Sequence, residues 1–160
     1  MLYTLSDEGN VELYDLRSHS LVSKQNIGKD AVGMIPELSG SEGYLISGHL
    51  SGRINFFDNR MNTPSSCLTL DKNIDGHSKG TMTVIHPHRN APIFATATSS
   101  QVVKVWSARG DQLGVVRAHA SILGQPIGPT KCLAFSPISL KLASGAEDNV
   151  CAVYSLEKIN

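Results

Sequence analysis

The chain has 160 residues, of which 41% are hydrophobic and 18% are charged, and its fourteen basic residues balance fourteen acidic ones. A net charge of zero gives no general attraction to nucleic acid or to acidic lipid, so neither class of partner is expected, and no apolar run is long enough for membrane insertion. The three cysteines (Cys67, Cys132 and Cys151) form no C-x-x-C pair, and we expect buried, reduced thiols in a cytosolic or nuclear setting, with the cytoplasm preferred.

A pattern of twelve residues occurs four times, and no copy has an insertion or a deletion. It reads TLSDEGNVELYD from Thr4, SGHLSGRINFFD from Ser47, TATSSQVVKVWS from Thr96 and SGAEDNVCAVYS from Ser144. The copies begin 43, 49 and 48 residues apart. A fixed period in the forties with two short strands in each copy is typical of a propeller repeat.

Each copy has the pattern of a β-hairpin. Small or β-branched residues come first, and turn residues such as those at 7–10 follow them. The second half of each copy alternates with a period of two, which indicates a strand. That strand ends on an aromatic residue at the same column in every copy: Tyr14, Phe57, Trp106 and Tyr154.

Two further strands are expected around each hairpin. Ahead of the second, third and fourth copies, apolar strands ending in proline are predicted at residues 31–36, 83–87 and 131–137. After the first three copies, outer strands are predicted at residues 21–23, 67–70 and 112–116, and loops at residues 58–66, 71–80 and 118–129. Four antiparallel strands in each unit describe a propeller blade.

The residues around the hairpins resemble those of the WD-repeat family. In that family a Gly-His pair, a Ser or Thr, an Asp and a Trp hydrogen-bond to one another and fix the blade. The resemblance assigns this blade-fixing role to His77, Thr98, Ser100 and Trp106 in the third copy and to His119, Asp148 and Tyr154 in the fourth. Serine stands in the place of the Asp in the third copy and tyrosine in the place of the Trp in the fourth, so the repeats are divergent.

The predicted fold is therefore all-β: an incomplete WD-repeat β-propeller with about three and a half four-stranded blades of an expected seven. The blades are expected at approximately residues 1–26, 27–72, 73–117 and 118–160. The first copy has no strand ahead of it and the fourth has none after it. We therefore expect further blades upstream of Met1 in a longer chain, because an open stack would expose an unpaired sheet edge.

A closer resemblance covers the chain from Gly43 onward. The segments SGRINFFDNRM from Ser51, GQPIGP from Gly124, CLAFSP from Cys132 and VYSLEK from Val153 are similar to the C-terminal propeller of the Raptor family, the regulatory-associated proteins of TOR. This resemblance implies a non-catalytic scaffold of TOR complex 1 that links the TOR kinase to its substrates and nutrient inputs. The alternatives are a generic WD-repeat adaptor, such as a ubiquitin-ligase substrate receptor or a vesicle-coat component, and a truncated product without function.

Two patterns that suggest chemistry lack the spacing that the chemistry needs. His86 and His88, with His77, have no cysteine or carboxylate at ligand spacing, so no metal site is predicted. Asp75, His77 and Ser78 are neighbours on one predicted loop, and no Gly-x-Ser-x-Gly elbow accompanies them. We expect no enzymatic activity and no cofactor.

A protein partner is expected to bind the loops that gather on one face of the propeller, because a rigid scaffold holds them in place. The candidates on this face are His49, Leu50, Arg53, Gln101, Ser121, Ile122, Gln125 and Glu147. Leu50 and Ile122 are apolar residues in otherwise polar loops. They either contact a partner or pack on a neighbouring blade.

Overall fold

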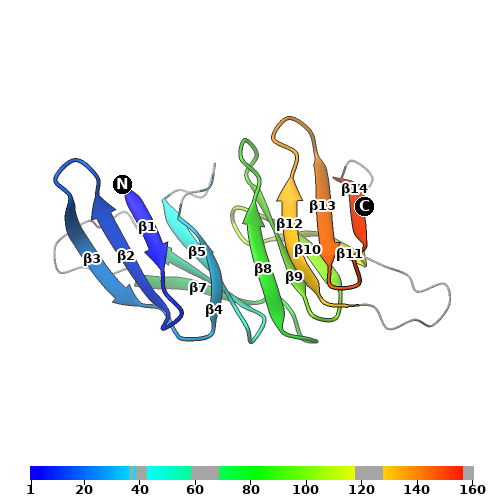
Figure 1. The fold of residues 1–160 in the computed structure, drawn as a ribbon, viewed down its shortest axis with the longest axis horizontal. Helices are drawn as coiled ribbons and strands as arrows, with labels where there is room; N and C mark the ends of the chain where they lie inside the picture. The colour runs from blue at the N-terminus through cyan, green and yellow to red at the C-terminus, as the bar shows by residue number, and fades with distance from the viewer. Residues whose placement is uncertain (37, 39–42, 59–68, 118–127, 157–160) are drawn as a thin grey trace.

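The computed structural model describes residues 1–36, 38, 43–58, 69–117 and 128–156. In these residues fourteen strands form four antiparallel sheets. Figure 1 shows the sheets in a row in chain order, with the N-terminus in the first and the C-terminus in the fourth. The prediction of an all-β fold is confirmed.

Each sheet is built from strands that follow one another in the sequence. Sheet 1 contains β1 (Leu2–Leu5), β2 (Asn10–Asp15) and β3 (Ser20–Asn26). Sheet 2 contains β4 (Ala31–Ile35), β5 (Tyr44–His49), β6 (Arg53–Asp58) and β7 (Thr69–Asp75). Sheet 3 contains β8 (Met82–Pro87), β9 (Ile93–Thr98), β10 (Val102–Ser107) and β11 (Gln112–Arg117). Sheet 4 contains β12 (Thr130–Phe135), β13 (Lys141–Ala146) and β14 (Cys151–Ser155).

The four copies of the repeated line form the same hairpin in the same register. The first position of each copy pairs with the ninth: Thr4 with Glu12, Ser47 with Asn55, Thr96 with Lys104 and Ser144 with Ala152. Residues at one column of the repeat therefore occupy equivalent places in the four sheets. This equivalence is used below to compare the sheets residue by residue.

The outer strands are longer than the sequence indicated. β7 extends to Asp75, so the prediction of a loop from residue 71 was wrong as far as residue 75. β3 spans Ser20–Asn26, whereas only residues 21–23 were expected. The outer strand pairs with one neighbour through its backbone and has water on its other side, so polar residues are accepted there and the apolar alternation is lost. Residues 59–66 and 118–127 of the other predicted loops lie outside the described residues.

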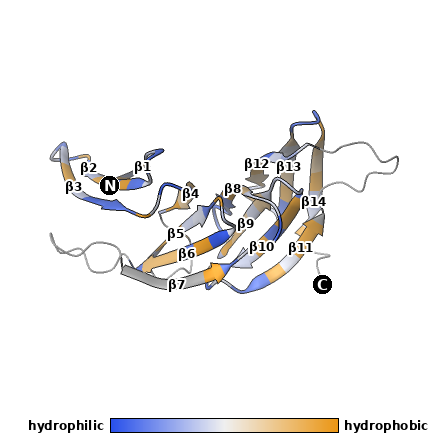
Figure 2. Ribbon diagram, turned by 90° about the horizontal axis from the view of Figure 1, so that it is seen from below, coloured by the Kyte–Doolittle hydropathy of each residue, from blue (hydrophilic) through white to orange (hydrophobic). Residues whose placement is uncertain are grey.

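Three apolar clusters lie between successive sheets. Val11, Leu45 and Phe57 join sheets 1 and 2; Ile46, Ile54, Phe56, Phe94 and Trp106 join sheets 2 and 3; Ala95, Ala97, Val103, Val105, Leu133 and Leu142 join sheets 3 and 4. Neighbours along a strand, such as Leu45 and Ile46, point to opposite faces and enter different clusters. Sheets 2 and 3 are thus covered on both faces, and the hydrophobic segments of their strands are orange in Figure 2.

Two of the three cysteines are exposed. Cys132 and Cys151 are free thiols on sheet 4, so the prediction of buried thiols was wrong for both. They lie on the face of sheet 4 that is turned away from sheet 3, and no other sheet of the described chain covers that face. Cys67 lies outside the described residues.

Candidate functional site

The hairpin turns and the connections between sheets form one continuous hydrogen-bonded rim. The first amide of a turn donates to a carbonyl of the connection into its own sheet: Leu50 N to Asp30 O at 2.7 Å, Ser99 N to Thr81 O at 2.8 Å and Glu147 N to Pro129 O at 3.1 Å. The far end of a turn binds the connection into the next sheet: Ile27 N to Gly9 O at 2.8 Å, His77 N to Gly52 O at 3.1 Å and Gln101 Nε2 to Gly128 O at 2.5 Å. We call residues 6–9, 27–30, 49–53, 75–81, 98–101, 128–131 and 146–149 the rim.

Below the rim, a buried trio of side chains ties the connection 76–81 to sheet 3. The Trp106 indole N–H donates to Thr96 Oγ1 at 2.8 Å, and the same hydroxyl is 2.7 Å from His77 Nε2. Burial, with a smaller effect from the nearby Lys104 charge, lowers the pKa of His77 from 6.5 to about 4. The imidazole is therefore neutral at physiological pH, and its Nε2 shares a hydrogen bond with the Thr96 hydroxyl, in which the tautomer of the ring decides the donor.

Thr98 and Ser100, which the WD-repeat resemblance assigned to this network, lie outside the trio. Thr98 Oγ1 is 3.0 Å from Ser100 Oγ, and the Ser100 hydroxyl also donates to Lys79 O at 3.2 Å. These two hydroxyls hold the turn 98–101 to the connection. His77 and Trp106 are joined by Thr96 in their place.

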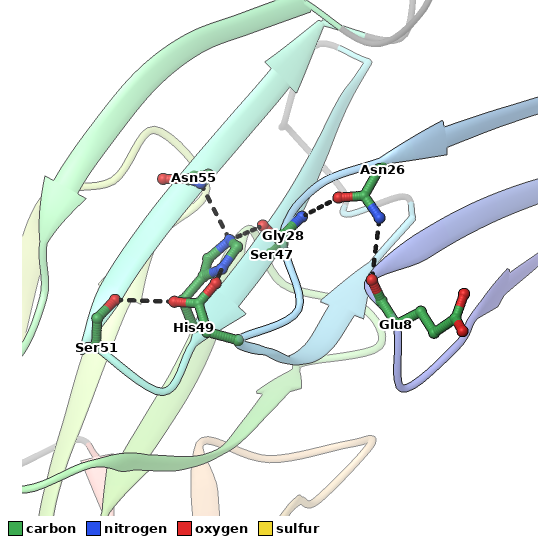
Figure 3. Close-up of polar contacts among 8 residues, drawn as sticks. Glu8, Asn26, Gly28, Ser47, His49, Ser51 and Asn55 are labelled. Carbon is green, nitrogen blue, oxygen red and sulfur yellow. Dashed lines mark hydrogen bonds and ion pairs between the residues drawn. The ribbon is translucent and has the colours of Figure 1, made fainter.

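Sheet 2 has a different network at the equivalent place, drawn in Figure 3. Here the histidine belongs to the strand: His49 Nε2 is 2.8 Å from Ser47 Oγ and 3.0 Å from Asn55 Nδ2. Its Nδ1 lies 3.0 Å from Asp30 Oδ1, and Ser51 donates to the other carboxylate oxygen at 3.2 Å. Burial raises the pKa of Asp30, but the bonds from His49 and Ser51 and the His49 charge outweigh it, so the pKa is lower than usual. The carboxylate of Asp30, in the connection from sheet 1 to sheet 2, thus fixes the position of the His49 ring in sheet 2.

In sheet 4 the network is reduced. Ser144 Oγ lies 3.4 Å from the Tyr154 hydroxyl, at the columns that Thr96 and Trp106 occupy in sheet 3. Asp148 accepts a bond from Val150 N at 3.0 Å and so shapes its own turn. His119 lies outside the described residues.

The partner-face candidates divide into buried residues that stabilise the rim and exposed residues that a partner can contact. His49 and Gln101 are 3% and 7% exposed, and their side chains hydrogen-bond to the connections between sheets. Leu50 is 47% exposed, and the side chains of Arg53 and Glu147 are 60% and 55% exposed. Ser121, Ile122 and Gln125 lie outside the described residues.

Sequence reasoning missed five residues of these networks: Thr96, Ser47, Ser144, Asn55 and Asp30. The signal for the first three was present, because every copy of the repeated line begins with a serine or threonine. Asp30 had no such signal, since the connections between sheets do not share a pattern.

Two further findings concern the described part of the chain. It contains no group of three or more His, Cys, Asp or Glu side chains placed to hold a metal ion. None of its segments is a helix with the length and apolarity needed to cross a membrane.

Comparison with known proteins finds relatives whose names agree with one another. No protein-family model matches the chain. It is 35% identical over 152 residues to "Regulatory-associated protein of TOR 1" of Arabidopsis thaliana, which covers 92% of this chain and 11% of the relative. It is 30% identical to "Target of rapamycin complex 1 subunit mip1" of Schizosaccharomyces pombe, with 94% and 11% covered, and 28% identical to "Protein raptor homolog" of Dictyostelium discoideum, with 92% and 10% covered. The chain spans about a tenth of the length of these relatives.

A solved structure shows the same fold. The crystal structure of Chaetomium thermophilum Raptor matches 93% of this chain and 14% of its own chain, with a TM-score of 0.69 and 23% identity. With the four sheets described above, this match confirms the prediction of an incomplete WD-repeat propeller. Over nearly all of its length, this chain is homologous to one segment of the Raptor proteins, the regulatory-associated proteins of TOR.

Proposed function

We propose that the chain is a non-catalytic scaffold for protein–protein interaction and serves, as part of a Raptor-like subunit of TOR complex 1, in TOR nutrient and growth signalling in the cytoplasm. The observation that carries the proposal is the 35% identity over 92% of the chain to a protein named for its association with TOR. Two further relatives bear names that make them subunits of target of rapamycin complex 1.

The charges of the rim favour a protein partner. Its exposed residues include both basic ones, Lys29 and Lys79, and acidic ones, Glu8 and Glu147, and Leu50 is a half-exposed apolar residue of the same rim. A nucleic acid is bound through a surface that is positively charged throughout, whereas mixed charges around an apolar residue are typical of protein interfaces.

The test is affinity purification of the full-length endogenous protein through a C-terminal tag, with mass spectrometry of what is retained. TOR kinase is expected among the partners. Recovery of a cullin-type ligase or a coat complex without TOR would contradict the proposed complex and favour a generic WD-repeat adaptor.

A variant pair then locates the contact. Leu50→Ser removes the apolar side chain from the rim, and Leu140→Ser is the matched control, because Leu140 is 41% exposed and lies in the β12–β13 turn away from the rim. Loss of a partner with Leu50→Ser alone places the contact on the rim. Unchanged recovery of every partner with Leu50→Ser would remove Leu50 from the proposed surface.

A further inference from the structure

One apolar side chain stands at a rim column where the other copies of the repeat carry polar ones. The residues at the fourth position of the repeated line are Asp7, Leu50, Ser99 and Glu147. In sheet 3 this residue is bonded to the connection, because Ser99 Oγ accepts from Thr81 N at 3.0 Å. In sheet 4, Glu147 Oε1 lies 2.9 Å from Lys131 Nζ. Leu50 can form neither contact, so the propeller repeat does not require its apolar side chain.

Leu50 is held in place by its backbone. Its N–H donates to Asp30 O at 2.7 Å, and its carbonyl accepts from Met82 N at 3.2 Å. The residue is 47% exposed and belongs to none of the three apolar clusters of the described residues. Packing on a neighbouring sheet therefore does not explain Leu50 in this part of the chain. A side chain on a fixed backbone loses little conformational freedom on binding, which suits Leu50 to contact with a partner.

Two lysines flank Leu50, one in each of the connections that hold it. Lys29 directly precedes Asp30, and Lys79 lies shortly before Met82. Both lysines are exposed, and neither forms an ion pair with another described residue. Sheets 2 and 3, which meet at this part of the rim, are the two inner sheets of the row in Figure 1.

The carboxylates of the same two connections already have partners. Asp30 Oδ1 lies 3.0 Å from His49 Nδ1, and its Oδ2 accepts from the Ser51 hydroxyl at 3.2 Å. Asp75 Oδ1 lies 3.8 Å from Arg53 Nε. In these connections and the turn between them, the charges without a partner among the described residues are thus positive. They lie on both sides of an apolar side chain.

We propose that this part of the rim binds an acidic segment of a partner protein. An apolar side chain of the segment packs on Leu50, and its carboxylates meet Lys29 and Lys79. The apolar contact supplies most of the affinity, whereas the ion pairs orient the segment, speed its association and disfavour basic partners. Such a partner rests on the proposed function, which makes the rim a protein-binding surface, and adds to it the chemistry that the surface recognises.

The first test joins each lysine to the carboxylate that it contacts. The full-length endogenous protein is purified with its partners and treated with a water-soluble carbodiimide, which couples an amine to a neighbouring carboxylate as an amide. Mass spectrometry is expected to find Lys29 or Lys79 joined to an Asp or Glu of another protein, in a segment that also carries an apolar residue. Lys131 and Glu147 are the internal control, since their charged atoms are 2.9 Å apart. Coupling of Lys29 and Lys79 only within their own chain, or not at all, while the control pair couples, would overturn the proposal.

Substitutions then separate the apolar contact from the charges. Leu50→Ser is expected to weaken binding of the cross-linked protein at least about tenfold, and Lys29→Glu and Lys79→Glu each by about three- to tenfold. Each charge reversal is also expected to reduce the salt dependence of binding, because an attraction that salt screens is removed. Leu140→Ser and Lys141→Glu are the matched controls, because both residues are exposed at the β12–β13 turn, away from the rim. Loss of binding with Leu50→Ser but with neither charge reversal would overturn the acidic partner.

A conservative variant checks that the cross-link reports on charge. Arginine keeps the positive charge but has no amine for the carbodiimide to couple, so the double variant Lys29→Arg, Lys79→Arg is expected to bind the partner without forming the cross-link. Treatment with a phosphatase is expected to leave the complex intact. Release of the partner by the phosphatase would assign the two lysines to phosphate groups and overturn the contact with carboxylates.

The acidic partner and the proposed TOR complex can fail separately. Recovery of TOR kinase without coupling of Lys29 or Lys79 to another protein would keep the proposed function and overturn the acidic partner. Coupling of these lysines to an acidic segment of another protein, with TOR kinase absent, would support the acidic partner and contradict the proposed complex.

Discussion

Thr96 joins the only tryptophan of the chain to the buried His77 through one hydroxyl group. It is fully buried, so bulk solvent does not reach it to replace a lost partner. A residue of this kind is costly to change, because a buried donor or acceptor left without a partner keeps its full desolvation penalty.

Thr96→Val is expected to lower the free energy of unfolding by about 2–3 kcal/mol, since the indole N–H and the imidazole nitrogen both lose their partner. The measurement is urea unfolding followed by Trp106 fluorescence. Thr98→Val is the matched control: Thr98 is equally buried, but its hydroxyl bonds to the exposed Ser100 and so the loss is smaller. A greater loss for Thr98→Val than for Thr96→Val would contradict the role given to Thr96.

His77 also predicts how stability depends on pH. Its pKa is about 4 in the folded chain and near 6.5 when unfolded, so between these values the unfolded chain binds the proton first. Stability is therefore full above about pH 6.5 and falls as the pH is lowered toward 4, by on the order of 2 kcal/mol at pH 5.

The comparison of wild type with His77→Gln isolates this contribution, because burial lowers the pKa of His86 as well and acts in the same direction. The urea midpoint of the variant is expected to change less between pH 7.5 and pH 5 than that of the wild type. Equal changes in both proteins would show that His77 is not the group that titrates.

At the scale of the elements, the hairpin turns share one backbone conformation. The sixth column of the repeated line has a positive φ in all four copies: 77° at Gly9, 87° at Gly52, 62° at Gln101 and 63° at Asn149. A Cβ on Gly52 would lie 2.3 Å from His77 O, in the connection that the turn supports. The turn of one sheet therefore fixes both its own hairpin and the approach of the next connection.

Gly52→Ala is expected to destabilise the chain by more than about 2 kcal/mol, because the left-handed backbone is strained for alanine and the new methyl group meets a backbone carbonyl. Asn149→Gly is the control at the equivalent column, where the side chain is exposed and the expected change is within about 0.5 kcal/mol. Both values come from thermal and urea unfolding. A Gly52→Ala variant as stable as wild type would show that the turn and the connection move independently.

At the scale of the whole molecule, no sheet has a core of its own among the residues that the structure describes. Each apolar cluster is shared by two sheets, and the large rings bridge them: the centroid of Phe94 in sheet 3 is 6.3 Å from that of Phe56 in sheet 2. Neighbouring sheets of a repeat array stabilise one another through such interfaces. A substitution that disrupts one interface therefore lowers the stability of both sheets.

Phe94→Ala is expected to cost about 3–5 kcal/mol and to lower the unfolding midpoint equally by fluorescence and by circular dichroism. Leu113→Ala, at a residue 49% exposed on β11, serves as the control and is expected to change little. Hydrogen exchange of the Phe94→Ala variant is expected to accelerate in sheet 2 as well as in sheet 3. Acceleration confined to sheet 3 would contradict the shared core.

The hairpins were predictable from the sequence because they are local. The segment from Val103 to Trp106 alternates with a period of two after turn residues, and this pattern predicts both the strand and its register. The repeat period likewise determined the propeller class, since four equivalent hairpins bury their faces by stacking on one another. The outer strand β7 carries no such pattern, and its length is decided by backbone pairing with β6.

The tertiary structure decided the polar networks, and it decided which faces of the sheets are covered. Whether His77 meets Thr96 or Thr98, and whether Asp30 reaches His49, depends on how each connection approaches the next sheet, which involves residues about twenty positions apart. The exposure of Cys132 and Cys151 depends on whether another sheet covers them. The sequence by itself determined which faces are apolar, because side-chain alternation is a local property. The tertiary structure decided which of these faces are covered, because burial is a relation between sheets.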